Sequence, residues 1–150
     1  MTISLIEGVT LSIAVLGAVL GVINTLHNIN KTRVKLKVIP KHAIPVGGMD
    51  PDLRMCIEVI NLGSIAVTIQ DVGVFYYGTK KRGAIIQPVF ADGGGWPQRL
   101  EPRSALTVYC QRAYSPEGHK IRTAYARTEC GVTKKGSSKA LKQIANEQNL

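Results

Sequence analysis

The sequence contains few of the residues that most often carry out chemistry. Only three of its 150 residues are histidine and three are cysteine, and no Cys-x-x-Cys pair occurs. Cys110, His119 and Cys130 are separated by nine and eleven positions, which matches no known pattern of metal ligands. The glycine-rich residues 92–96 lack the Gly-Lys-Ser/Thr that completes a phosphate-binding loop. We therefore expect no catalytic residue, no metal and no cofactor, and a protein that is not an enzyme.

The cysteines are odd in number, so at least one thiol stays unpaired. An odd count suits a reducing compartment better than a secreted disulfide framework. The alternative is a Cys110–Cys130 disulfide in an exported domain.

Lysine and arginine are absent from the first 30 residues. Residues 3–26 form an apolar run that only Glu7 interrupts. A helix of that length is about 36 Å long, enough to cross a hydrocarbon core of about 30 Å. We expect residues 1–30 to be a transmembrane anchor helix.

Two other interpretations of this run are weaker. A signal peptide needs a basic segment before the apolar run and a small-residue cleavage site after it, and neither is present. A core helix of a soluble protein needs a polar face, whereas this run is apolar on nearly all sides.

Basic residues gather immediately after the apolar run, at Lys31, Arg33, Lys35 and Lys37. Positively charged flanks stay on the cytoplasmic side of a membrane. We therefore expect a single-pass protein of the cell (inner) membrane, with the N-terminus outside and the domain in the cytoplasm.

Small and polar residues recur every three or four positions along the apolar run, and so form one stripe on a helix. The stripe contains Glu7, Thr10, Ala14, Gly17, Gly21, Asn24 and Asn28. Small residues let helix backbones approach closely within lipid. We predict a helix–helix contact through Ala14, Gly17, Ala18 and Gly21, either with a second copy or with another protein. The alternative is a stripe that simply faces lipid.

Residues 31–136 show the short apolar runs and frequent turn residues of a β-domain. Aromatic residues make up only 5% of the chain, so its core must consist mainly of Val, Ile and Leu. The expected strands are 33–39, 53–61, 66–70, 72–77, 84–90, 105–112 and 120–128, with a short one near 132–134. Their spacing predicts an Ig-like antiparallel β-sandwich, and a small barrel is the alternative. Residues 137–150 form the tail, in which Ser137 or Ser138 caps a short helix over 139–148.

Two segments support a family resemblance. Residues 57–73 read as an apolar strand, Asn61-Leu62-Gly63, a second strand and then Val72-Gly73, and residues 96–109 enter a late strand through Leu100-Glu101-Pro102. Over about 53–145 the chain resembles bacterial and phage membrane-anchored Ig-like β-sandwich proteins, in which glycine is usual where Arg103 stands. The resemblance implies a fold and a phage or prophage accessory role, without site residues.

The net charge of +9 is the remaining signal. Lys31, Arg33, Lys35 and Lys37 are predicted to share one face of a strand below the bilayer, where anionic headgroups attract each basic residue by about 1 kcal/mol. The C-terminal third adds further basic residues, but no nucleic-acid motif is recognisable. Anionic lipid is therefore the preferred partner, and nucleic acid the weaker one.

Trp96 is the only tryptophan and follows the glycine-rich residues 93–95. It either packs into the core or contacts a partner or the membrane interface.

Together these observations predict a non-enzymatic, membrane-anchored protein that binds, scaffolds or regulates a partner at the membrane surface. The alternatives are an exported envelope structural or adhesion module, and a membrane-tethered nucleic-acid binder.

Overall fold

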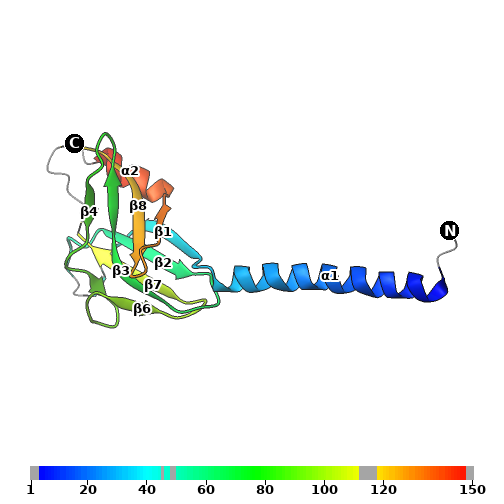
Figure 1. Ribbon diagram of the computed structural model, residues 1–150. Coiled ribbons are helices and arrows are strands. Elements are labelled where there is room, and N and C mark those ends of the chain that lie inside the picture. The colour runs from blue at the N-terminus through cyan, green and yellow to red at the C-terminus, as the bar shows by residue number, and fades with distance from the viewer. Residues whose placement is uncertain (1–3, 45, 48–49, 112–117, 148–150) are drawn as a thin grey trace. The chain divides into compact units, whose positions relative to one another are not determined.

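The computed structural model describes residues 4–44, 46–47, 50–111 and 118–147 (Figure 1). The chain divides into two compact units, Met1–Arg33 and Val34–Leu150. We call the second unit the β-domain, and each unit is described by itself.

The first unit contains one long helix, α1 (Leu5–Thr32). It begins with a capping box: the Ser4 backbone amide donates to Glu7 Oε2 (2.9 Å), and the Glu7 amide donates to Ser4 Oγ (3.3 Å). This pair satisfies two amides that a helix N-terminus otherwise leaves unpaired. Glu7 is therefore explained as a capping residue.

The β-domain contains two antiparallel sheets, as the sequence predicted at the level of fold class. The first sheet has the order β1 (Leu36–His42), β2 (Met55–Asn61), β7 (Ala105–Cys110) and β5 (Val89–Phe90). The second has the order β4 (Arg82–Ala84), β3 (Val67–Tyr76), β8 (Ile121–Thr128) and β9 (Thr133–Gly136), and β6 (Gln98–Leu100) pairs with the start of β3.

The two sheets share one apolar core. Ile57, Val59 and Val108 of the first sheet and Val72 of the second are fully buried in it. Because strand side chains alternate between faces, each of these strands presents every second residue to the core. The core is indeed built mainly of aliphatic residues.

One pair of sheet edges lies close together, since β1 contacts β9. Gly136 of β9 approaches the backbone of Val38 so closely that a Cβ at position 136 would overlap the Val38 carbonyl oxygen. Only glycine allows this approach.

The predicted C-terminal helix is present as α2 (Lys139–Glu147), and residue 148 lies outside the described residues. The Ser138 hydroxyl accepts a hydrogen bond from the Leu141 amide (3.1 Å), as expected of a cap, and donates to the Pro40 carbonyl. Leu141 and Ile144 are buried, and α2 packs against β1 and β8 (Figure 1). The helix is amphipathic, and its apolar face packs against these strands, as the spacing of its apolar residues predicts.

Several predicted strand boundaries were wrong. Residues 66–70 and 72–77 form a single strand, β3, with a register shift between Ile69 and Asp71. Residues 84–90 do not form one strand, because β4 and β5 belong to different sheets. Strand β6 was not predicted, and residue 112 of the predicted strand 105–112 lies outside the described residues.

The prediction that four basic residues share one face of a strand was also wrong. Helix α1 continues through Lys31 to Thr32, whose hydroxyl bonds the Ile29 carbonyl (3.1 Å), and the backbone becomes extended only at Arg33. Strand β1 begins at Leu36, so Lys37 alone of the four lies in a strand. The alternation of basic residues over 31–37 therefore does not produce a strand, because the hydrogen bonds of α1 continue through its first two positions.

Candidate functional site

Helix α1 has the length and composition needed to cross a membrane, as an anchor or a signal sequence does. None of its described residues is buried. Its hydroxyl groups are satisfied within the helix: Thr10, Ser12 and Thr25 donate to the carbonyls four residues earlier at 2.8–2.9 Å. These three hydroxyl groups are therefore paired without water, which an apolar environment would require.

The predicted stripe of small residues is open. A Cβ at Gly17 or Gly21 would meet no heavy atom within 4 Å, and a shallow hollow surrounds Gly21. Ala14 and Ala18 are likewise exposed. The stripe is thus accessible along its length, and its contact with another helix stays a prediction.

The four basic residues predicted to meet the membrane surface have different surroundings. Lys31 lies in the last turn of α1, and Arg33 follows the helix end. Lys35 is half-buried before β1, whereas Lys37 is exposed on β1 opposite Ile60. Their shared property is their place in the sequence directly after the apolar helix.

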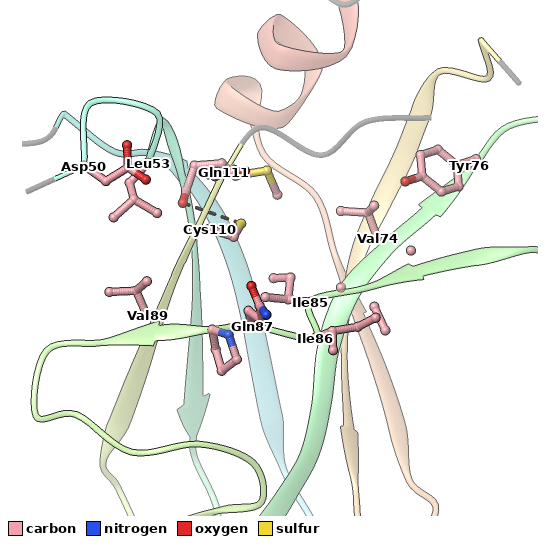
Figure 2. Close-up of a pocket in the computed structure, with 15 residues that line it drawn as sticks. Asp50, Leu53, Val74, Tyr76, Ile85, Ile86, Gln87, Val89, Cys110 and Gln111 are labelled. Carbon is pink, nitrogen blue, oxygen red and sulfur yellow. Dashed lines mark hydrogen bonds between the residues drawn. The ribbon is translucent and has the colours of Figure 1, made fainter. Parts of the chain in front are cut away.

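A cleft opens between the two sheets on the side of β4 and β5, and we call it the β4–β5 cleft (Figure 2). Its volume is about 460 Å³. Leu53, Val89 and Cys110 lie on one side of it and Val74 and Tyr76 on the other, with the 85–87 segment between them. Apolar side chains and polar groups, among them Asp50, Gln87 and Gln111, share its walls, so the cleft suits a ligand that presents both kinds of surface.

The thiol of Cys110 in this cleft is poorly suited to nucleophilic chemistry. Its Sγ donates a hydrogen bond to the Met55 carbonyl (3.7 Å), and burial raises its pKa to about 12. A nucleophile requires the thiolate, which is scarce at neutral pH when the pKa is that high. Cys110 acts here as a small packing residue.

The other two cysteines differ in exposure. Cys56 is buried, and burial raises its pKa, whereas Cys130 is exposed. All three are free thiols, so the predicted alternative of a Cys110–Cys130 disulfide does not apply. A hydrogen bond to the Thr128 hydroxyl (3.1 Å) lowers the pKa of the Cys130 thiol.

Trp96 packs against the core, the first of its two predicted roles. Its Nε1 donates to the Ile85 carbonyl (2.9 Å), and its ring meets that of Phe90 edge-on at 5.2 Å between centroids. The ring is only partly buried. A contact of its remaining surface with a partner stays a prediction.

A charged network on the second sheet was not predicted from the sequence. The Arg82 guanidinium lies 3.7 Å from Asp71 Oδ2 and 5.5 Å from the centroid of the Tyr125 ring. Burial, and secondarily the Asp71 carboxylate, raise the pKa of Tyr125. Since Asp71 is on β3, Arg82 on β4 and Tyr125 on β8, the network links three strands, and we assign it a structural role.

Within the described part of the chain, no three His, Cys, Asp or Glu side chains lie close enough together to hold a metal ion. His42 instead bonds Gln143 of α2 (3.1 Å), and His119 lies beside Gly78.

No protein-family model matches the chain, and no curated protein is significantly similar to it.

Proposed function

We propose that this chain is a non-enzymatic, single-pass membrane protein whose β-domain binds a partner at the membrane surface. The observation that carries the proposal is α1, a 28-residue apolar helix with no buried residue. A core helix of a soluble protein buries its apolar face, and α1 leaves all of its described leucines and isoleucines exposed.

Binding is favoured over catalysis by the chemistry of the β4–β5 cleft. Leu53, Val74 and Val89 line it beside polar groups, and its Cys110 thiol, with a pKa of about 12, stays protonated at neutral pH. A buried, protonated thiol is a poor nucleophile, so the cleft favours binding over covalent catalysis.

We further propose an Ig-like β-sandwich for the β-domain. In the usual immunoglobulin lettering, β1, β2, β7 and β5 correspond to strands A, B, E and D, and β4, β3, β8 and β9 correspond to C′, C, F and G. This order supports the proposal. The disulfide of antibody domains has no counterpart, because β8 contains no cysteine.

Orientation follows from the basic residues after α1. Lys31, Arg33, Lys35 and Lys37 favour a cytoplasmic β-domain, with these side chains near anionic headgroups.

The test of the anchor uses the full chain expressed in bacteria. Intact mass spectrometry should find residues 1–30 retained, and alkaline carbonate should leave the protein in the membrane pellet. A matched variant, Leu16→Arg, places a charge at mid-helix at a cost of about 2.5–3.5 kcal/mol and should reduce membrane integration. A shortened, soluble product from the unaltered chain would instead identify α1 as a cleaved signal sequence.

A further inference from the structure

A second pocket, distinct from the β4–β5 cleft, lies between β8 and α2 and has a volume of about 380 Å³. Lys120, Arg122 and Lys142 line it: Lys120 directly precedes β8, Arg122 is on β8 and Lys142 is on α2. No Asp or Glu is among its described lining residues. We call it the β8–α2 pocket.

The described residues provide no counter-ion for these three cations. Within the described residues none of them forms an ion pair with a carboxylate. Three like charges around one hollow repel each other, and the net charge of +9 adds to the positive potential. A bound anion would relieve this repulsion.

The pocket is also partly preorganised. Arg122 is held over the Tyr77 ring, with its Cζ 5.9 Å from the ring centroid, and the Tyr77 amide donates to the Lys120 carbonyl (2.8 Å). Such stacking restricts the guanidinium without consuming its hydrogen-bond donors.

The floor of the pocket is apolar. Ile121, Leu141 and Ala145 line it and are almost completely buried. Lys120, Arg122 and Lys142 are themselves exposed, so their charged ends stand at the rim of this floor and are open to an anion from solution.

We propose that the β8–α2 pocket binds a phosphate group, either of a soluble phosphomonoester or of a lipid headgroup. Phosphate suits the pocket because an arginine fork pairs with two phosphate oxygens while lysines supply point charges. The Ser137 hydroxyl and the Asn146 amide also line the pocket and offer further donors. The inference goes beyond the proposed function, because it requires neither a membrane anchor nor a particular orientation.

The test uses the full chain in micelles of a neutral detergent, titrated calorimetrically with inorganic phosphate and pyrophosphate at low salt. We expect saturable binding that weakens as NaCl is added. Lys142→Gln should reduce the affinity about tenfold, the usual effect of losing one charge-assisted hydrogen bond. Arg122→Gln should do the same, and circular dichroism should find both variants folded.

The matched control is Lys139→Gln. Lys139 lies three residues earlier on the same helix and is exposed, but it does not line the pocket. Compared at about 0.15 M salt, where the Debye length is about 8 Å, it should lose clearly less affinity than Lys142→Gln, because a lysine outside the pocket attracts the anion only through screened charge and donates it no hydrogen bond. An equal loss from Lys139→Gln and Lys142→Gln, or no saturable binding by the unaltered chain, would overturn the proposal.

Short-chain phosphatidic acid and phosphatidylcholine distinguish the two sources. If the phosphatidic acid displaces bound phosphate and loses this ability in Lys142→Gln, the site takes a lipid headgroup. If neither lipid displaces it while both inorganic anions bind, the site takes a soluble phosphate compound. Either result supports a phosphate site.

Discussion

The Asn61 side chain accepts a hydrogen bond from the Gly63 amide, with 2.9 Å between Oδ1 and N. Asn61 is fully buried, and its Nδ2 donates to the carbonyls of Ile65 (2.8 Å) and Glu101 (3.1 Å). A residue whose neighbourhood in the sequence indicates only a turn thus joins two loops that are forty residues apart. Its Oδ1 thus closes the local connection after β2, while its Nδ2 holds a loop that lies far along the chain.

Asn61→Ala should lower the free energy of unfolding by about 2–4 kcal/mol. The substitution leaves a buried amide and buried carbonyls without partners, each at a cost of about 1–3 kcal/mol before relaxation. Urea denaturation of the full chain in detergent, followed by tryptophan fluorescence, measures the change. Ser64→Ala, at an exposed position of the same loop, is the control and should change stability by less than about 0.5 kcal/mol.

Arg103→Gly should stabilise the β-domain by about 0.5–1 kcal/mol. Arg103 is exposed and has a φ of +57°, a left-handed conformation that costs a side-chain-bearing residue about 1–2 kcal/mol. It follows Pro102 in a turn closed by the Ser104 amide and the Glu101 carbonyl (3.3 Å), at the position where a type II turn favours glycine. The gain is partly offset, because glycine is more flexible in the unfolded chain.

The same denaturation experiment checks this substitution. Lys134→Gly on β9 is the control and should destabilise by about 0.5–1 kcal/mol, because it adds the flexibility without relieving strain. A loss of stability in Arg103→Gly as large as that of Lys134→Gly would show that the left-handed turn carries no strain.

Cys130 offers a natural probe of membrane topology. It is the exposed thiol of the three, since Cys56 and Cys110 are buried. If the β-domain is cytoplasmic, a membrane-impermeant maleimide should label the chain only after the cells are permeabilised, and not at all in Cys130→Ser. Labelling of intact cells would place the β-domain outside.

The lowered pKa of Cys130 sets the pH dependence of that labelling. Because maleimide reacts with the thiolate, its rate on permeabilised membranes should rise with pH and level off at a lower pH than for a cysteine in an unstructured peptide.

Replacing Lys31, Arg33, Lys35 and Lys37 with Gln should allow some chains to insert in the reverse orientation. These chains should then be labelled in intact cells.

Gly17→Leu and Gly21→Leu should weaken self-association or partner association of α1 in a membrane two-hybrid assay. Leucine would hold the backbones apart at positions where close packing is the main source of attraction within lipid. Val15→Leu, off the stripe, serves as the matched control and should associate as the unaltered helix does. Equal signals from all three variants would leave the stripe without a role in association.

Strong local patterns in the sequence sufficed for the helices and for most strand positions. A long apolar run that only Glu7 interrupts predicts α1, and Ser138 with the spacing of Leu141 and Ile144 predicts α2. The mainly β character of residues 34–136 likewise follows from short apolar runs between turn residues. These features depend on neighbours within a few positions of one another.

Contacts between distant segments decided the rest. Residues 84–90 read as one strand, but β4 finds its partner in β3 and β5 finds its partner in β7, so they separate into two sheets. The β8–α2 pocket exists because α2 docks beside β8 and brings Lys142 to the same hollow as Arg122, twenty residues earlier. No local pattern encodes such a meeting, because it depends on which apolar faces bury one another when the whole chain is packed.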